Sequence, residues 1–160
     1  APAADTPAGR STLHQLERKA GMACLIYLDI DHFKRINDTH AHAVGDEALR
    51  QVVATCRQHL RVIDVFGRLG GEEFGILLVD CAREQGRQIA SRIRRAIEAA
   101  AVEYGGLAVA VTASVGLACT DSCSHVLRLL CADADAALYL AKDSGRNCVV
   151  ADGGRDALVA

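Results

Sequence analysis

Residues 22–30 limit the fold more than any other segment, because they form an almost unbroken apolar run that contains Ile26, Tyr27 and Leu28. A run of this length and composition is typical of a β-strand that is covered on both faces. It therefore predicts a central strand. Its end is abruptly polar, since residues 29–38 bring carboxylates, basic side chains and an amide to the point where the strand leaves the core.

The rest of the chain alternates between helical and strand periodicity. The expected helices are residues 11–20, 45–60, 83–101 and 126–141, and the expected strands are residues 64–69, 74–79, 107–119 and 147–151. Gly70-Gly71 predicts a hairpin turn, Gly116 a bend or bulge, and Gly145 a helix C-cap. This order predicts an α+β fold, with a mixed, mainly antiparallel central sheet and helices packed on it.

The helix expected over residues 83–101 has one apolar face. Ile89, Ile93, Ala96 and Ile97 recur at the helical period, whereas Arg87, Arg92, Arg94, Arg95 and Glu98 are expected on the remaining surface. Among the aromatic residues, Phe33, Phe74 and Tyr139 are expected in the core.

Length and charge restrict the function. A chain of 160 residues can fold around a single hydrophobic core. We expect a domain over residues 11–155 and a tail over residues 156–160. Residues 1–10, which contain both prolines, are expected to be a linker. A net charge of -2 and a pI of about 6.3 argue against a nucleic-acid polymer as partner. The chain lacks an apolar run of about 20 residues, so we expect no membrane contact. Because the sequence does not begin with methionine, we expect a piece of a longer protein.

The seven cysteines are odd in number and scattered along the chain. Most of them lie within apolar runs, where a free cysteine behaves as a small hydrophobic residue. This pattern predicts reduced thiols in a cytoplasmic protein. Cys119 and Cys123 are the only close pair, and the absence of a CxxC motif argues against a zinc site.

Two pairs of carboxylates suggest a metal site. Asp29 and Asp31 lie at the strand end, and Glu72 and Glu73 lie beside Gly70-Gly71. Each pair alone has an ordinary explanation, a solvated strand end or a polar turn. If the strand and the hairpin are neighbours in one sheet, the two pairs come within metal-ligand distance. Carboxylates without cysteine or histidine partners suit magnesium, and glycines allow close approach of a phosphate, so the combination favours a nucleoside triphosphate site.

Several short motifs in order then resemble one known family. They are Asp29-Ile30-Asp31-His32-Phe33-Lys34-Arg35-Ile36-Asn37-Asp38, Gly45-Asp46, Arg68-Leu69-Gly70-Gly71-Glu72-Glu73-Phe74, Ser114-Val115-Gly116, the run 132–139 and the run 141–147. This series, spanning residues 29–147, resembles the GGDEF family of diguanylate cyclase domains. The resemblance implies a fold like the palm of adenylyl cyclases and polymerases. It also implies condensation of two GTP molecules into cyclic di-GMP with release of two pyrophosphates.

The resemblance also implies roles for single residues. Asp29, Glu72 and the carbonyl of Ile30 would bind Mg²⁺, or Mn²⁺ in its place, and Glu73 would act as a ligand or near the attacking hydroxyl, so Glu72 and Glu73 are the catalytic candidates. The substrate-binding candidates are Asn37 and Asp46 for guanine, Lys34, Lys142 and Arg146 for phosphate, and Phe33 and His42 near the nucleotide. Asp31, Asp133 and Asp135 are expected to support the fold. One GTP lies in each half-site, so catalysis would require a homodimer.

A second motif resembles the inhibitory site of the family. Arg61-Val62-Ile63-Asp64 has the RxxD form and the expected five-residue gap before Gly70, and Arg92 matches a third contact. Arginine can stack on guanine and grip phosphate, so these residues predict feedback inhibition by cyclic di-GMP.

The sequence departs from the family pattern at two places, and one alternative function fits the same motifs. The opening motif of the family, DxLTGLxNR, is eroded around residues 5–9, and Ala41 stands where the family prefers glycine before His42. The alternative function is a cyclic di-GMP receptor that turns over little GTP. A third interpretation, a domain for protein interaction alone, leaves the many polar site positions without a role.

Overall fold

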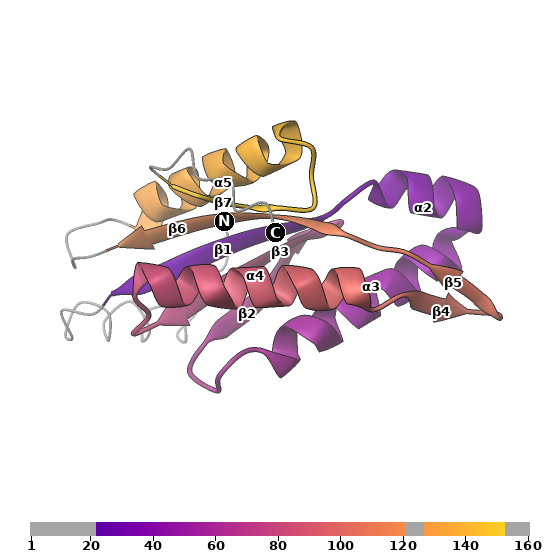
Figure 1. The fold of residues 1–160 in the computed structure, drawn as a ribbon, viewed down its shortest axis with the longest axis horizontal. Coiled ribbons are helices and arrows are strands. Elements are labelled where there is room, and N and C mark those ends of the chain that lie inside the picture. Colours follow the sequence, from indigo (N-terminus) through magenta and orange to yellow (C-terminus); the bar gives the residue numbers. More distant parts are fainter. Residues whose placement is uncertain (1–21, 121–126, 153–160) are drawn as a thin grey trace.

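The computed structural model describes residues 22–120 and 127–152, and Figure 1 shows them as a twisted sheet with helices on both faces. The elements in order are β1 (Ala23–Ile30), α2 (Phe33–His40), α3 (His42–Gln58), β2 (Val65–Gly70), β3 (Glu73–Val79), α4 (Arg83–Ala99), β4 (Val102–Tyr104), β5 (Leu107–Val109), β6 (Ala113–Thr120), α5 (Leu127–Asp143) and β7 (Val149–Ala151).

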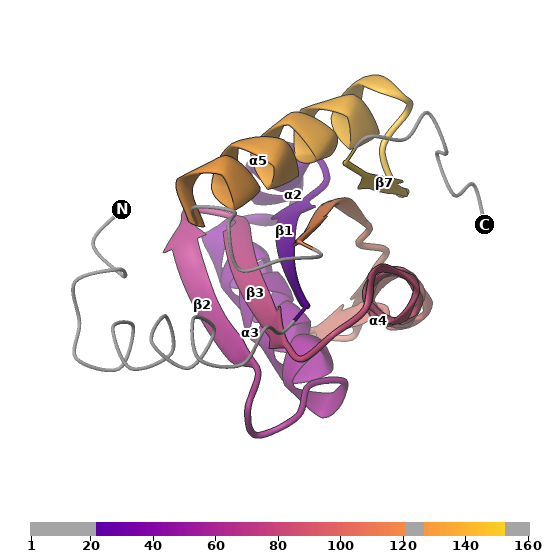
Figure 2. The ribbon, with the colours of Figure 1, turned by 90° about the vertical axis from the view of Figure 1, so that its left-hand side faces the viewer.

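β1 lies at the centre of the five-stranded sheet, whose strand order is β2-β3-β1-β6-β7. It pairs antiparallel with β3 and β6, while β6 and β7 pair in parallel. The predicted mixed, mainly antiparallel sheet is therefore confirmed. Ile26 and Leu28 belong to a core shared with α3 and α4, whereas Leu25 packs with Leu130 of α5. Figure 2 shows α5 on one face of the sheet and α3 and α4 on the other, which explains the apolar run of β1.

Most predicted elements agree with the structure to within about three residues at each end. The exception is the strand expected over residues 107–119, which is divided. Gly105 and Gly106 adopt φ values of 57° and 80°, and the turn they form folds β4 against β5 as a separate two-stranded sheet. β6 then begins at Ala113. The helix expected over residues 11–20 lies outside the described residues.

Gly116 neither bends nor bulges β6, so that prediction is wrong. Pairing with β1 runs through it without interruption, from Val115 opposite Leu28 to Leu117 opposite Ile26. The glycine instead allows α5 to approach the sheet. A Cβ atom there would lie 2.3 Å from the backbone nitrogen of Leu138 and 2.4 Å from the carbonyl oxygen of Ala134.

Two side chains lie in environments opposite to those expected. Tyr139 is 69% exposed on α5, although it was expected in the core with Phe74, which is fully buried. Phe33 is half-buried against the core. Conversely, Arg94 was expected on the surface of α4 but is only 3% exposed. Helical period alone is misleading at residue 94, because α4 is covered there by the chain around Asn147, which bonds to the Arg94 guanidinium.

The structure joins Cys24 and Cys119 by a disulfide, so the expectation that all cysteines are reduced is wrong for this pair. The register of β1 and β6 places the two residues directly opposite each other, with their Cα atoms 4.1 Å apart. Sequence spacing does not reveal this register. Cys56, Cys81 and Cys148 are buried free thiols, and burial raises the pKa of Cys56 to about 12.

No helix within residues 22–120 and 127–152 is long and apolar enough to cross a membrane.

Replacing Gly116 by alanine is expected to destabilise the domain by about 2–3 kcal/mol, because the added methyl group would force α5 away from the sheet. The free energy of unfolding in urea measures this change. Gly67→Ala in β2 is the matched control, since a Cβ atom there meets nothing within 4 Å. Equal effects of the two substitutions would contradict the close-approach role of Gly116.

Candidate active site

The carboxyl end of β1 meets the tip of the β2–β3 hairpin. Asp29 is the cross-strand partner of Glu73, and the backbone N–H of Ile30 donates to the carbonyl oxygen of Glu72 at 3.2 Å. The sheet therefore brings together the four residues expected to hold the metal. Arg68 secures the hairpin tip, since its Nε and Nη2 atoms donate to the carbonyl oxygen of Gly71 at 2.9 and 2.6 Å.

Asp29 carries a buried negative charge at this junction. It is 6% exposed, and the Nζ atom of Lys142 donates to its Oδ2 atom at 2.8 Å. Burial raises the pKa of Asp29; the Lys142 ammonium opposes this shift, while the charges of Glu72 and Glu73 add to it. A carboxylate in this environment gains strongly from a nearby cation, because its ionised form is poorly solvated.

The donors at this junction fit a magnesium ion better than a softer metal. They are carboxylate and carbonyl oxygens, and in the part of the chain that the structure describes no three histidine, cysteine, aspartate or glutamate side chains converge closely enough to form a metal site from protein ligands alone. Magnesium typically binds one or two protein carboxylates and completes its shell with water and substrate phosphate. Asp29 and the glutamates of the hairpin suit that pattern.

Asp31 has a different environment, although it lies only two residues from Asp29. Its carboxylate accepts hydrogen bonds from Ser114 Oγ at 2.6 Å, Thr112 Oγ1 at 2.7 Å and the backbone N–H of Asn147 at 3.0 Å. These three bonds tie the end of β1 to the start of β6 and to the turn after α5. Asp31 therefore supports the site rather than presenting a free carboxylate.

The two residues expected to recognise guanine come from adjacent helices. The side chain of Asn37 on α2 lies against Gly45 of α3, where a Cβ atom would be 1.9 Å from Asn37 Oδ1. Asp46 follows Gly45 directly and is exposed. Glycine at position 45 thus allows the carboxamide of Asn37 to lie beside the residue that precedes Asp46. Lys34 and His42 are exposed on the same two helices.

The two later phosphate candidates lie around the end of α5. Lys142, in its last turn, contacts Asp29, and Arg146 is exposed in the turn that follows. The backbone N–H of Arg146 donates to the carbonyl oxygen of Ala141 at 3.0 Å. Arg146 and Asn147 both have left-handed backbones, with φ values of 67° and 47°.

The RxxD segment forms a compact turn before β2. Arg61 donates to Asp64 through Nη2 at 2.8 Å and through Nε at 3.2 Å, and its backbone N–H donates to the same carboxylate at 2.8 Å. The side chain of Asp64 is 1% exposed and that of Arg61 is 45% exposed. Arg92 lies close enough to His59, two residues before this turn, for its charge to lower the pKa of that imidazole in addition to the larger effect of burial.

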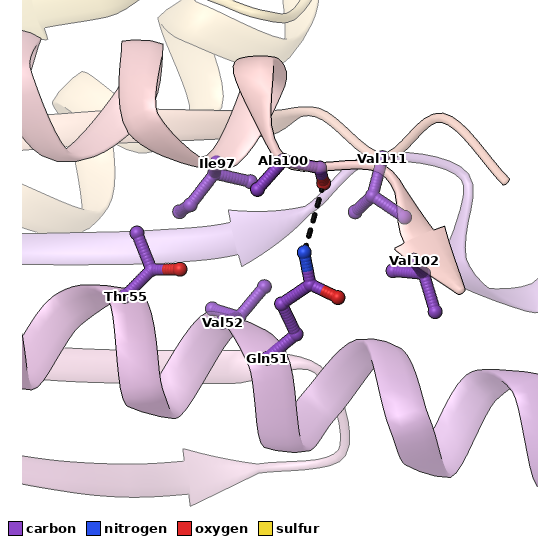
Figure 3. A pocket seen from close by; sticks show the side chains of 7 residues that line it. All are labelled: Gln51, Val52, Thr55, Ile97, Ala100, Val102 and Val111. Atoms are coloured by element: carbon purple, nitrogen blue, oxygen red, sulfur yellow. Dashed lines mark hydrogen bonds between the residues drawn. The ribbon is translucent and has the colours of Figure 1, made fainter. Parts of the chain in front are cut away.

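The structure also contains a small apolar cavity between α3 and α4, shown in Figure 3. Its volume is about 10 Å³, which is at the lower limit for a single water molecule. Gln51 Nε2 donates to the carbonyl oxygen of Ala100 at 3.0 Å across it. The cavity therefore lies between two packed helices and is too small to bind a nucleotide.

Sequence reasoning missed the contacts of Arg94, Glu98 and Thr112. The signal available for them was indirect: Asn147 and Ser114 belong to the recognised motifs, and both bond to this group of side chains or to Asp31. Nothing in the pattern of α4 indicates that Arg94 points inward.

The backbone of Ala41, between α2 and α3, has φ 76° and ψ 158°. Glycine adopts this region readily, whereas a side chain there costs about 1–3 kcal/mol. We expect Ala41→Gly to stabilise the domain by about 1 kcal/mol, after allowing for the greater freedom of glycine in the unfolded chain. Ala54→Gly in the exposed middle of α3 should destabilise it by about 1 kcal/mol. Urea unfolding measures both, and a loss of stability in Ala41→Gly would contradict the strain.

Comparison with known proteins identifies one family. The family model described as "Diguanylate cyclase, GGDEF domain" matches residues 9–148. The probable diguanylate cyclase DgcT of Escherichia coli is 41% identical over 133 residues, which are 79% of this chain and 28% of that protein. This chain therefore spans less than a third of the length of that relative.

Solved structures are similar over most of the chain. The GGDEF domain of DgcB from Caulobacter crescentus, in complex with c-di-GMP, has a TM-score of 0.82 at 30% identity and covers 88% of this chain and 84% of its own. The active GGEEF domain of a diguanylate cyclase from Vibrio cholerae has a TM-score of 0.82 at 27% identity and covers 90% of this chain and 91% of its own. The chain belongs to the GGDEF domain family.

Proposed function

We propose that this domain is a diguanylate cyclase that condenses two GTP molecules into cyclic di-GMP and releases two pyrophosphates. One observation carries the proposal: Asp29 lies at the end of the central strand, opposite Glu73 of the Gly-Gly-Glu-Glu hairpin, with the Lys142 ammonium on its carboxylate. This combines metal-binding oxygens with a cation for phosphate. The relatives named diguanylate cyclases support the same reaction.

In this proposal Asp29, Glu72, Glu73 and the carbonyl of Ile30 hold Mg²⁺, for which Mn²⁺ can substitute. The bound metal supplies charge neutralisation for the triphosphate and lowers the pKa of the attacking ribose 3′-hydroxyl. Glu73, which is exposed, lies near that hydroxyl and accepts its proton. The 3′-oxygen of one GTP forms a bond to the α-phosphorus of the other, and the bond to the β-phosphate breaks as pyrophosphate leaves.

The remaining site residues bind and orient GTP. Asp46 accepts from the N1 and N2 hydrogens of guanine and Asn37 donates to an acceptor of the base, an arrangement that rejects adenine because a bound adenine would cover these polar groups without pairing them. Phe33 and His42 border the base. Lys34, Lys142 and Arg146 contact the phosphates as charge-assisted donors.

Each domain has one such set of residues and so provides one half-site. Two copies must face each other, because each GTP attacks the other, and we propose a homodimer as the active form. GTP as substrate places the reaction in the cytoplasm.

We also propose that cyclic di-GMP inhibits the enzyme at Arg61, Asp64 and Arg92. The support is the exposed guanidinium of Arg61, which the buried carboxylate of Asp64 already holds in place. Beside it lies a depression of about 370 Å³ lined by Arg57, Leu60, Arg61, Val62, Asp64 and Phe66. The solved complex of the DgcB domain with c-di-GMP shows that a related domain binds this product.

Incubation with GTP and magnesium at high protein concentration, followed by nucleotide chromatography, tests the reaction. Wild-type protein should form cyclic di-GMP, and Glu73→Gln should lower the rate by about 10²–10⁴-fold through loss of the proton acceptor. Glu103→Gln is the matched control, since Glu103 is exposed on β4. Absence of product in the wild type, with retained binding of cyclic di-GMP, would favour the receptor function instead.

Calorimetric titration with cyclic di-GMP tests the inhibitory site. Arg61→Ala should weaken binding by about thirtyfold or more, because it removes the guanidinium that we propose stacks on guanine and pairs with phosphate. Arg92→Ala should also weaken it, without disturbing the buried Asp64. Arg95→Ala, an exposed substitution on α4, should leave the affinity unchanged. Wild-type affinity in both Arg61→Ala and Arg92→Ala would refute the assignment.

A further inference from the structure

Arg94, Glu98 and Asn147, here called the Arg94 cluster, form a closed ring of hydrogen bonds between α4 and the turn after α5. Arg94 Nη1 donates to Glu98 Oε2 and to Asn147 Oδ1, both at 2.7 Å. Asn147 Nδ2 donates to Glu98 Oε1 at 2.8 Å. The side chain of Arg94 is 3% exposed and that of Glu98 is 46% exposed, so the ring closes over a buried guanidinium. The two contacts of Asn147 join residues that are 53 and 49 positions apart in the chain.

The cluster holds one side of a turn that is held on its other side by Asp31. The backbone N–H of Asn147 donates to Asp31 Oδ2 at 3.0 Å. The side chain of Asn147 thus bonds to α4 while its backbone bonds to the end of β1. Arg146 and Asn147 both have positive φ values, a conformation that costs free energy for arginine and less for asparagine.

This turn carries Arg146 and follows Lys142, whose ammonium lies 2.8 Å from Asp29. The place of Arg146 relative to Asp29 therefore depends on the bond of its own N–H to Ala141 and on the two anchors of its neighbour Asn147. One anchor, Asp31, is part of the same strand end as Asp29. The other anchor is α4, none of whose residues is among the proposed metal or GTP ligands.

We propose that Arg94 and Glu98 are positioning residues for the triphosphate: through the side chain of Asn147 they fix the turn that presents Arg146. The inference rests on the proposed function and extends it to residues that contact neither nucleotide nor metal. In this proposal the buried guanidinium of Arg94 contributes to the position of the phosphate-binding Arg146 as well as to the stability of the fold.

Asn147→Gly is the most selective test. Glycine accepts the positive φ of this position and keeps the N–H that bonds to Asp31, while Arg94 keeps its bond to Glu98. Of the hydrogen bonds of residue 147, only those of the side-chain amide to α4 are lost. Affinity for a non-hydrolysable GTP analogue with magnesium should fall about tenfold, because small displacements of a positioned group are costly. Affinity for guanosine, titrated by NMR, should change by less than twofold, since guanosine has no phosphate.

Glu98→Gln should also weaken binding of the GTP analogue, because its amide places a donor opposite either Arg94 or Asn147. Glu84→Gln, at the other end of α4, is the matched control and should leave binding unchanged; Glu84 bonds only to Gln88 among the described side chains, at 3.4 Å. Equal losses for guanosine and the GTP analogue would mean a purely structural role and would overturn the inference.

A double-mutant cycle tests whether the effect passes through Arg146. In an Arg146→Ala background, Asn147→Gly should lose most of its effect on the affinity for the GTP analogue, because the group that it positions is already absent. Additive losses would overturn the inference.

Hydrogen exchange gives a readout that needs no ligand. The amides of Ser144, Arg146 and Asn147 are hydrogen-bonded and should exchange faster in Asn147→Gly and Glu98→Gln but not in Glu84→Gln. Unchanged exchange would overturn the positioning role even if GTP binds. If wild-type protein bound no GTP while exchange responded as expected, the proposed function and the triphosphate role would fail, and only the anchoring of the turn would stand.

Discussion

Two-sided pairing of β1 is the constraint on which the rest of the structure depends. The strand bonds to β3 on one edge and to β6 on the other, and its residues are buried on both faces apart from partial exposure of Tyr27. A slip of one residue in either register would exchange the residues that face α5 with those that face α3 and α4. The same registers set Asp29 against Glu73 and place Asp31 within reach of Thr112 and Ser114.

Two similar aspartates at the end of β1 lie on one face of the sheet but have different partners. Asp29 and Asp31 point to the same face of the sheet, the face covered by α5. Asp29 meets the Lys142 ammonium of α5, and Asp31 meets the backbone of Asn147 just beyond it. Close seating of α5 on Gly116 makes both contacts possible. A buried carboxylate beside one cation suits metal and phosphate chemistry, whereas a carboxylate with three donors serves as an anchor.

Much of the fold was predictable from local pattern. The apolar run of β1, the glycine turn between β2 and β3 and the helical periods of α3 and α4 each reflect short-range physics. Errors arose where distant segments meet. Local pattern predicts a bend at Gly116, which instead allows close contact with α5. It predicts an exposed Arg94, which the chain near Asn147 covers, and a buried Tyr139, which is exposed.

The sequence by itself determined most of the elements, the family and the candidate residues for metal, guanine and phosphate, because these depend on short motifs and local periodicity. Only the tertiary structure decided which side chains meet. The disulfide between Cys24 and Cys119, the ion pair of Asp29 with Lys142 and the ring of Arg94, Glu98 and Asn147 join residues far apart in the chain. Strand register and helix packing create these contacts, and neither is encoded in a single segment.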